Sequence, residues 1–338
     1  MKLVVQLLTW NGAKYIPFLF ASLRAQTLRD WELYILDNAS SDETVKLVEK
    51  ELADFPRAYR LEKGQKNLGF AGGHNYLWRK SASEYLMLLN QDLYLRPDCL
   101  EKLVDFLGKE TGAAAVSPRL MKWDFAVNAF TDKIDSLGLK VYKNRRVADW
   151  LQAENWDEIK RGFIQLPDYP IIETFGVSGT APVFRRRALA DAAFSDGGFF
   201  DNLYGSYKED VDLAFRLRSA GHKAFVLSDA VVYHDRSSQF RRSVRENKKL
   251  QPAHIKYNSY KNHLMTLYKN EYGPNFVLDF FWISWYEIKK LIWFLLFDRS
   301  VLRGWGEIWS RRRELKSKRR EIKEKRRIGW REARTWFK

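Results

Sequence analysis

Residues 3–12 read LVVQLLTWNG and residues 32–43 read ELYILDNASSDE, and in both stretches an apolar run ends abruptly in polar and turn-forming residues. Short apolar runs bounded in this way are typical of buried β-strands. Each run is followed by a segment with the three-to-four-residue spacing of an amphipathic helix. Strands that alternate with helices predict βαβ units and a mostly parallel sheet.

The alternation extends over the first 120 residues and predicts an α/β fold. The expected strands are Leu3–Thr9, Glu32–Asp37, Tyr85–Asn90 and Ala113–Ser117, and the expected helices lie near Ile16–Ala25, Thr44–Leu52, Gly72–Lys80 and Pro97–Leu107. Residues 120–172 lose this alternation, so we expect an irregular insertion there that can act as an acceptor flap. Order returns from Phe175 to about Asp235, residues 250–272 have a helical pattern, and we place the end of the domain at residue 272.

Composition limits the class of protein. The chain has 338 residues, of which 46% are apolar and 30% charged, and this is enough to build a buried core. Its single cysteine, Cys99, excludes an internal disulfide and suits a reducing compartment. The apolar start lacks a small-residue cleavage pattern, so we interpret it as a strand and not as a signal peptide. We therefore expect a cytoplasmic location.

The net charge of +16 is concentrated at one end of the chain. Residues 299–338 contain 16 Lys or Arg against 5 Asp or Glu, which gives this segment a net charge of +11. A basic segment favours an anionic partner, either membrane lipid or nucleic acid. Because no folded nucleic-acid-binding motif accompanies it, we favour lipid and expect no nucleic-acid partner.

Asp37 stands at the end of the second expected strand. Downstream of it, Ser40 and Glu43 have the spacing of a capping box, with Ser40 as the N-cap of the next helix. This interpretation leaves Asp37 unexplained, because Asp37 precedes the cap. A carboxylate at a strand end can accept a hydrogen bond from a nucleobase imide. Asp37 is therefore a candidate nucleotide contact.

A glycine-rich loop with the sequence NLGFAGGHN occupies residues 67–75 and leads into a helix. Glycines let a backbone approach a ligand closely, and a helix N-terminus favours phosphate. The loop is equally consistent with a purely structural turn. It matches neither the Rossmann nor the Walker pattern.

Two further strand ends carry groups suited to a divalent cation. Asn90-Gln91-Asp92 follows an apolar strand, and the Asp92 carboxylate is a hard oxygen ligand. His234 ends the apolar run that begins at Val231, and imidazole is a common metal ligand. In isolation, each residue also fits an ordinary turn or a satisfied polar side chain.

Glu209, Asp210 and Asp212 place three carboxylates within four positions at the start of an amphipathic helix. A single acid at this place is explained by the helix dipole. Three acids directly after the flexible pair Gly205 and Ser206 are more typical of a general-base site.

Taken in order, six segments resemble the inverting family 2 glycosyltransferases of the GT-A fold, and especially the rhamnosyltransferase-like members that build bacterial surface polysaccharides. The segments are TWNG at 9–12, DNASSD at 37–42, NLGFAGG at 67–73, LNQD at 89–92, SGTA at 178–181 and EDVD at 209–212. The resemblance covers about residues 2–270. It implies a Rossmann-like, mostly parallel GT-A sheet flanked by helices.

The resemblance also implies binding roles for the matching residues. Those implied to bind the nucleotide sugar are Thr9, Asn11, Asp37, Asn67, Gly69, Asn90, Gln91 and Asp92. Asp92 and His234 would hold a Mg²⁺ or Mn²⁺ ion at the diphosphate. Asn90 stands where the family motif Asp-x-Asp has its first aspartate, so a single carboxylate of that motif remains.

The implied chemistry is a single displacement with inversion. Asp210 matches the catalytic base, and Glu209 would orient that base or the acceptor. The donor is a nucleotide diphosphate sugar, with dTDP-rhamnose favoured and a UDP-hexose or GDP-mannose as the alternative. The acceptor is a glycan or a polyprenyl-linked sugar. A non-catalytic, membrane-bound nucleotide-sugar-binding protein is the competing interpretation.

Residues 273–338 are expected to form a basic, Trp-rich, amphipathic helical extension. At 100° per residue, one stripe contains Phe281, Trp285, Ile288, Ile292 and Leu295. Charges interrupt the apolar stretches, so we expect no transmembrane helix. Together with the basic tail, the stripe predicts that residues 276–338 anchor the protein peripherally on the anionic inner face of the cell membrane. The alternative is that this helix packs on the protein's own core and that the charged tail is solvated.

Overall fold

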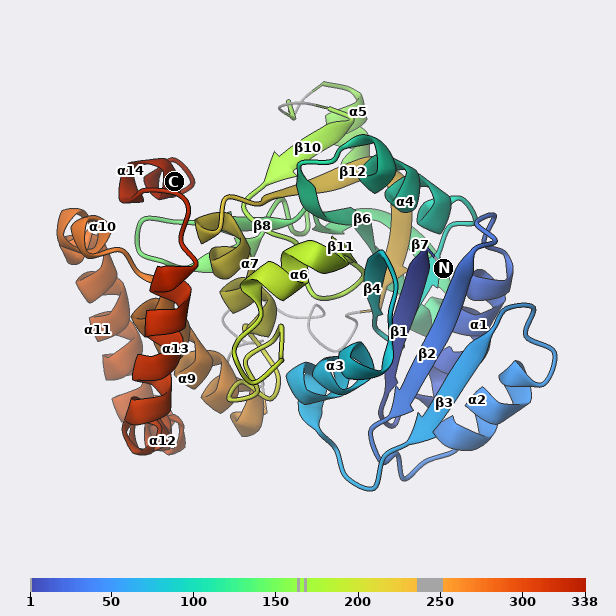
Figure 1. Ribbon diagram of the computed structural model, residues 1–338, viewed down its shortest axis with the longest axis horizontal. Helices are drawn as coiled ribbons and strands as arrows, with labels where there is room; N and C mark the ends of the chain where they lie inside the picture. The colour runs from blue at the N-terminus through green and yellow to red at the C-terminus, as the bar shows by residue number, and fades with distance from the viewer. Residues whose placement is uncertain (1, 163–164, 167–168, 236–251) are drawn as a thin grey trace.

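The computed structural model describes residues 2–162, 165–166, 169–235 and 252–338. Its centre is a sheet with the strand order β10-β12-β6-β11-β4-β1-β2-β3, with β5 paired to β12 and β7 paired to β6 (Figure 1). A separate hairpin consists of β8 and β9. The bounds of the strands are β1 Leu3–Thr9, β2 Trp31–Asp37, β3 Tyr59–Lys63, β4 Tyr85–Leu89, β5 Leu93–Leu95, β6 Ala113–Asp124, β7 Ala129–Ser136, β8 Leu139–Val141, β9 Val147–Asp149, β10 Ile171–Thr174, β11 Val183–Arg185 and β12 Lys223–His234.

Parallel pairing prevails in the part of the sheet that the sequence predicts. Strands β3, β2, β1 and β4 are parallel neighbours, and β6 pairs in parallel with β12. The short strand β11 is antiparallel to β4 and β6, and β10 is antiparallel to β12. The predicted α/β architecture with a Rossmann-like sheet is confirmed.

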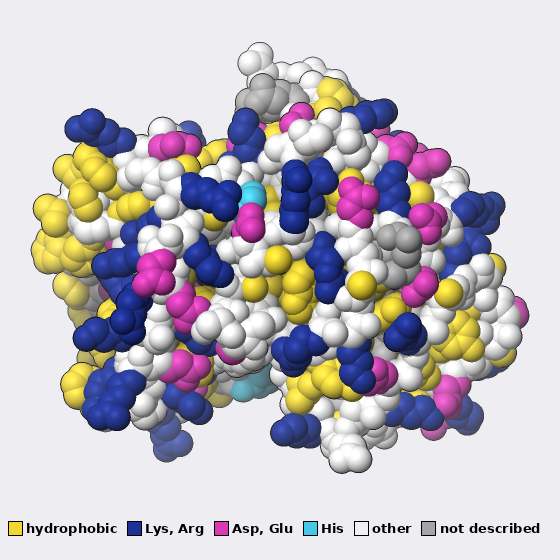
Figure 2. Space-filling model, in the orientation of Figure 1, with side chains coloured by type: hydrophobic (Ala, Val, Ile, Leu, Met, Phe, Trp, Pro, Cys, Tyr) yellow, Lys and Arg dark blue, Asp and Glu magenta, His cyan; other side chains and the backbone are white. Residues whose placement is uncertain are grey.

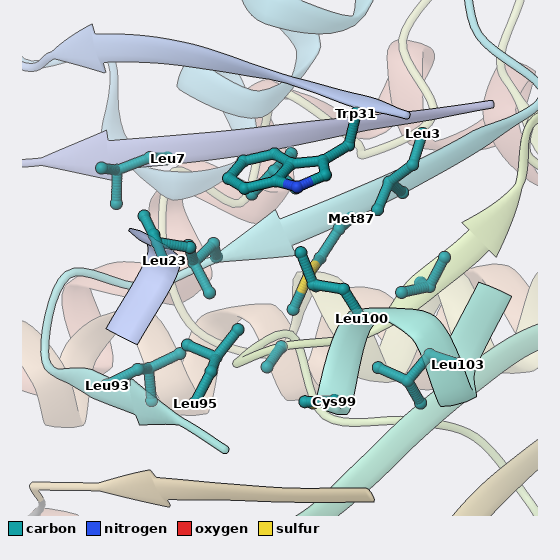
Figure 3. Packing of buried hydrophobic residues seen from close by; sticks show 14 of the residues in the cluster. Leu3, Leu7, Leu23, Trp31, Met87, Leu93, Leu95, Cys99, Leu100 and Leu103 are labelled. Carbon is teal, nitrogen blue, oxygen red and sulfur yellow. The ribbon is translucent and has the colours of Figure 1, made fainter. Parts of the chain in front are cut away.

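Helices cover both faces of this sheet. One face carries α1 Ile16–Arg24, α2 Thr44–Leu52 and α4 Cys99–Lys109, and the other carries α3 Gly69–Lys80, α6 Arg186–Ala192 and α7 Glu209–Ser219. Successive side chains of a strand point to opposite faces, so Leu3 and Leu7 join the first layer while Val4 and Leu8 join the second. Figure 3 shows the first layer, in which strand residues meet Leu23 of α1 and the free thiol of Cys99 is buried.

The differences from the sequence-based prediction have local causes. The strand β3 was not expected, because its sequence YRLEK is polar and it lies exposed at the edge of the sheet. The stretch 120–172, expected to be an irregular insertion, is irregular over about half its length and contains short strands and a helix over the rest. It contains the end of β6, then β7, β8, β9, α5 Trp156–Lys160 and the start of β10. These short elements are buried through contacts with distant residues such as Val226 of β12, which no local pattern reveals.

The chain after residue 252 forms a group of helices beside α7 (Figure 1). Helix α9 packs against α7, α12 and α13, and Phe337 returns to pair with Val141 of β8. In the described part of the chain, no helix combines the length and the apolar character needed to cross a membrane. The bounds are α9 Ala253–Asn270, α10 Gly273–Leu278, α11 Phe280–Phe297, α12 Arg303–Ser310, α13 Arg312–Glu324 and α14 Trp330–Arg334.

A buried ionic network joins these helices to the sheet domain. Both oxygens of Asp201 are used, one by Lys269 of α9 at 2.5 Å and the other by Lys318 of α13 at 2.6 Å. Lys269 also contacts Asp212 of α7 at 3.0 Å. Burial alone would raise the pKa of Asp201, but the two lysines outweigh burial and hold it well below its ordinary value. The network therefore ties α7, α9 and α13 together.

We expect D201N to lower the free energy of unfolding by about 3 kcal/mol, because it leaves buried ammonium groups without their main counter-charge. Urea denaturation at pH 7 measures this. Since the folded-state pKa of Asp201 is depressed, its stabilisation is present above the ordinary carboxyl pKa and is lost as the pH falls below it. The control is E49Q, which removes an exposed pair with Lys63 and should cost about 0.5 kcal/mol or less. Equal urea midpoints for D201N and wild type would contradict the role of the network.

Candidate active site

The carboxyl ends of β1 and β2 lie side by side and bring Thr9 and Asp37 together. The Thr9 hydroxyl donates to Asp37 Oδ1 at 2.9 Å, and both residues are buried. Next to them, Asn11 has φ +46° and its side-chain oxygen accepts from the amide of Ser41 at 2.8 Å. Ligands of open α/β sheets bind at strand ends of this kind. The structure therefore brings together, at one edge of the sheet, these three residues that were predicted to contact the nucleotide sugar.

The predicted N-cap role of Ser40 is wrong. Helix α2 begins at Thr44, and the Ser40 hydroxyl donates instead to Asp37 Oδ1 at 2.5 Å. The amide of Ser40 donates to the other oxygen, Asp37 Oδ2, at 2.8 Å. Ser40 donates to Asp37 instead of capping the helix because the two residues lie in the same turn and are buried or half-buried there. Asp37 consequently fixes the loop after β2, and both of its carboxylate oxygens are used inside the protein.

Gln91 connects the ends of β4 and β1. Its side chain accepts from the amide of Trp10 and donates to the carbonyl of the same residue, each at 2.9 Å. Neighbouring Asn90 is half-buried, and its amide donates to the carbonyl of Thr180 at 3.2 Å. Gln91 thus positions the loop after β1. Asn90 lies at the end of β4, where the sequence predicted a contact with the nucleotide sugar.

The glycine-rich loop packs against a second loop of the protein. Gly69 has φ +70°, and a Cβ added to it would lie 2.7 Å from the carbonyl oxygen of Gly205. The amide of Ala71 donates to that same carbonyl at 2.9 Å, and the amide of Phe70 donates to the Ser206 hydroxyl at 3.2 Å. Asn67 closes the turn by accepting from the amide of Gly69 at 2.7 Å. The structural alternative therefore accounts for the glycines, since the first amides of α3 are used inside the protein.

His234 stands between two carboxylates. Its Nε2 lies 3.3 Å from Asp92 Oδ2, and its Nδ1 lies 2.9 Å from Asp135 Oδ2. Burial opposes protonation of His234, but the two carboxylates outweigh burial and raise its pKa to about 9. Asp92 and His234, predicted as metal ligands, are thus neighbours. Asp135 was missed because it lies 99 residues away in the stretch expected to be irregular.

These residues fit a divalent cation that is shared with a substrate. A carboxylate and an imidazole are suitable ligands for Mn²⁺, and Mg²⁺ commonly takes one or two carboxylates together with substrate phosphates. A second carboxylate on the far nitrogen of a ligating histidine fixes the ring and its tautomer, which is the position of Asp135. Among the described residues, no group of three or more His, Cys, Asp or Glu side chains is arranged to hold a metal ion by itself. Substrate oxygens would have to complete the coordination.

Glu209 and Asp210 open helix α7, next to the loop that contains Gly179. Asp210 Oδ2 accepts from the amide of Gly179 at 3.1 Å, and Oδ1 accepts from the amide of Val211 at 2.7 Å. Burial raises the pKa of Asp210, although these amides and Lys208 partly oppose the rise. Burial and the charge of Asp210 raise the pKa of Glu209 well above its ordinary range. Oε2 of Glu209 is buried with no hydrogen-bond partner among the described residues.

Asp212, the third carboxylate of the cluster, does not face the site. It is fully buried and forms ion pairs with Arg216 at 2.9 Å and with Lys269 at 3.0 Å. One helical turn separates Asp212 from Arg216, and this spacing alone predicts such a pair. The interpretation of all three acids as one general-base cluster was wrong for Asp212.

A strained turn precedes the Glu209–Asp210 pair. Tyr207 and Lys208 have φ values of +73° and +70°, in the left-handed region that side chains disfavour. The side-chain amide of Asn262, on α9, donates to the carbonyls of Tyr204, Ser206 and Tyr207 at 3.0, 3.0 and 2.7 Å. Sequence reasoning missed Asn262, since nothing local marks an asparagine inside a long helix as a support for a distant turn.

The chain matches a known family model over much of its length. The model described as glycosyl transferase family 2 covers residues 5–191, which include the strand-end residues and Asp92 but not Asp210 or His234. Chondroitin synthase of Escherichia coli is 32% identical over 107 residues, and the chain spans 15% of its length. An N-acetylglucosaminyl-diphospho-decaprenol L-rhamnosyltransferase of Mycobacterium tuberculosis is 25% identical over 250 residues, which are 70% of this chain and 76% of that protein.

Solved structures have the same fold at low sequence identity. Staphylococcus aureus TarS 1–349 in complex with UDP-GlcNAc has a TM-score of 0.52 and 17% identity, covering 80% of this chain and 68% of that one. GalNAc-T7 with UDP, GalNAc and Mn²⁺ has a TM-score of 0.58 and 12% identity, covering 79% and 48%. These likenesses support the GT-A-like architecture. Because the family model matches more than half of the chain, the protein belongs to glycosyl transferase family 2 and is a glycosyltransferase.

Proposed function

We propose that the protein transfers a sugar from a nucleotide diphosphate sugar to a hydroxyl of a glycan or polyprenyl-linked acceptor, with inversion. The observation that carries this proposal is Asp210, a carboxylate held by two backbone amides at the start of α7. Such a group can accept the proton of an acceptor hydroxyl while that oxygen forms its bond to the anomeric carbon. The bond from that carbon to the diphosphate breaks in the same step, and the nucleotide diphosphate leaves with the electron pair.

The metal would sit at Asp92 and His234. When bound, Mg²⁺ or Mn²⁺ neutralises charge on the leaving diphosphate. Asp135 keeps the imidazole of His234 oriented, and Asn90 supplies a neutral side chain beside Asp92. Thr9, Asn11 and Asp37 would contact the base and ribose.

The choice of the sugar donor rests on the relatives. We favour dTDP-rhamnose because the Mycobacterium tuberculosis relative, whose similarity extends over 70% of the chain, is named a rhamnosyltransferase. A UDP-hexose or GDP-mannose is the alternative, and TarS was solved with UDP-GlcNAc. The name of the mycobacterial relative also supports a sugar diphosphate on a polyprenyl chain as acceptor, and hence a role in cell-surface polysaccharide synthesis.

We also propose that the enzyme acts on the cytoplasmic face of the cell membrane. Helix α11 contacts the protein through Ile283, Glu287, Lys290 and Phe294, so its predicted apolar stripe points outward. Phe281 is 70% exposed, and Figure 2 shows apolar side chains gathered at the edge formed by α10 and α11. Helix α11 thus packs on the protein through the side opposite the stripe, and the stripe itself is exposed. The other exposed stripe and flanking side chains are Val277, Leu278, Phe280, Trp282, Trp285, Ile288, Ile292, Leu295, Leu296, Phe297, Trp305 and Trp309.

The charges around this apolar surface support an anionic bilayer as its partner. Arg299, Arg303, Arg311, Arg312 and Arg313 are all exposed next to it. Apolar side chains with tryptophans and a rim of arginines match the interface of an anionic membrane, where each cation near the surface contributes about 1 kcal/mol.

We expect D210N to retain binding of the donor but to lose transfer by roughly 10²- to 10⁴-fold in kcat, because its amide cannot accept the proton. Single-turnover transfer and calorimetric binding of the donor separate the two effects. The matched control is D105N, an exposed aspartate on α4, which should transfer normally. Near-normal turnover by D210N would remove Asp210 as the base, and absence of transfer in wild type with every donor would favour the non-catalytic binding protein.

We expect D135N to weaken Mn²⁺-dependent donor binding by roughly 10- to 100-fold, because the ring of His234 loses the partner that orients it. Calorimetric titrations of dTDP-rhamnose, UDP-sugars and GDP-mannose, each with Mn²⁺ and with EDTA, identify the donor and measure this effect. The D105N variant again serves as control. An unchanged metal dependence in D135N would exclude this role of Asp135.

We expect the triple variant F281S/W285S/I288S to lose binding to vesicles that contain anionic lipid, while wild type floats with them. These side chains are exposed, so their replacement should leave the fold intact. A control that replaces two exposed apolar residues elsewhere, Y59S/V127S, should float like wild type. If the triple variant and wild type float equally, the membrane surface lies elsewhere or does not exist.

A further inference from the structure

The loop after β1 connects the nucleotide side of the candidate site to its metal side. The loop ends in the short 3-10 turn Ala13–Tyr15, and the Tyr15 hydroxyl donates to Asp235 Oδ2 at 2.7 Å. Asp235 directly follows His234, one of the two predicted metal ligands. Gln91 ties the same loop to the end of β4, whereas Tyr15 ties it to the end of β12.

Asp235 also contacts the other predicted metal ligand. Its amide donates to the carbonyl of Asp92 at 3.1 Å. Its side chain is fully buried, and the ammonium of Lys14 lies 4.0 Å from its Oδ2. Asp235 therefore meets Asp92 through its backbone and Tyr15 through its carboxylate. A displacement of Asp235 would move the backbone on which both predicted ligands stand.

The side chain of Tyr15 is held in one orientation. Its ring packs edge-on against Phe125, with ring centroids 4.8 Å apart, and Phe125 lies between β6 and the strand that carries Asp135. Burial, Asp235 and Asp92 raise the pKa of Tyr15, so its hydroxyl stays protonated and acts as the donor. A hydrogen bond from a hydroxyl to a carboxylate is stronger than one between two neutral groups.

The nucleotide side of the loop has supports of its own. Three consecutive backbone amides donate to side chains in the connection from β2 to α2. Loss of the Tyr15 hydroxyl alone should leave these contacts in place. The hydrogen bonds are Asn11 to the Ser40 hydroxyl at 3.0 Å, Gly12 to the Thr44 hydroxyl at 2.8 Å and Ala13 to Asp42 Oδ2 at 3.2 Å.

We propose that Tyr15 is a positioning residue for the metal side of the donor site. Its hydroxyl holds Asp235 in place, and Asp235 in turn positions Asp92 and His234 to take a divalent cation together with the donor diphosphate. This proposal rests on the proposed function and adds to it a link between the two sides of the donor site. Loss of the hydroxyl should weaken the metal-dependent part of nucleotide binding and spare the metal-independent part.

Calorimetric titration of the full-length protein with UDP, dTDP and GDP, each with Mn²⁺ and with EDTA, tests this role. The readout is the ratio of the affinity with Mn²⁺ to the affinity in EDTA, for the nucleotide that wild type binds. We expect Y15F to lower this ratio by roughly 10-fold, as the loss of a group that supports a metal ligand predicts, and to leave the affinity in EDTA unchanged. Phenylalanine keeps the ring contact with Phe125, so this variant should fold.

Further variants separate positioning from a general loss of structure. D235N retains an oxygen that can accept from Tyr15 and should keep most of the Mn²⁺ effect, whereas D235A should lower the ratio as Y15F does. Y59F changes an exposed tyrosine on β3 and should bind nucleotide like wild type under both conditions. An equal loss of affinity with Mn²⁺ and in EDTA would indicate a merely structural role of Tyr15 and would overturn the proposal.

The titration also distinguishes this proposal from the proposed reaction, because it requires no transfer. An unchanged ratio in Y15F would overturn the positioning role even if wild type transfers sugar normally. A lowered ratio in Y15F would support that role even if no donor gives transfer, and the lack of transfer would count against the transferase reaction alone. Absence of a Mn²⁺ effect in wild type would overturn both the positioning role and the proposed metal site.

Discussion

The buried ion pairs of Asp212 fix the helix on which the catalytic pair stands. Asp212 contacts Arg216 in its own helix and Lys269 in α9, and Lys269 also contacts Asp201. Moving one charge from water into a protein costs several kcal/mol, and a single buried pair often fails to recover it. Here the ammonium of Lys269 meets two carboxylates, and Lys269 and Arg216 hold the pKa of Asp212 low despite burial. These paired charges hold α7 in place against α9.

Helix α9 contacts both the turn that precedes Glu209 and helix α11. Toward the sheet domain, Asn262 holds the strained turn that precedes Glu209, and Asn270 donates to Asp212 at 2.8 Å. Away from it, His263 and Tyr260 contact Glu287 and Phe294 of α11. The geometry of the candidate site and the orientation of the apolar surface therefore depend on the same helix. A membrane bound at α11 would have a fixed position relative to Asp210.

The sequence predicts what local pattern determines and misses what distant contacts determine. The buried strands β1, β2 and β4 were predicted because a buried strand needs a continuous apolar run. The stripe from Phe281 to Leu295 was predicted because helical spacing specifies one side. The pattern did not predict which side of the helix faces the protein. Glu287 and Lys290 face inward because Glu287 pairs with His263 and Lys290 lies over the ring of Tyr260. Asp92 and His234 were found as separate strand ends, whereas Asp135 and Asn262 act on partners roughly 55 to 100 residues away.

Glu209 and Asp210 are adjacent in the sequence, but their carboxyl groups lie in different environments. Glu209 is buried and Asp210 is half-buried, and removal from water favours the neutral form of each. Asp210 accepts amide hydrogen bonds on both oxygens, which favours its ionised form, while Glu209 Oε2 has no such donor among the described residues and also faces the charge of Asp210. When two carboxylates lie this close, the better solvated one keeps the charge. The two amide hydrogen bonds therefore favour the negative charge on Asp210 over Glu209, which suits the base proposed above.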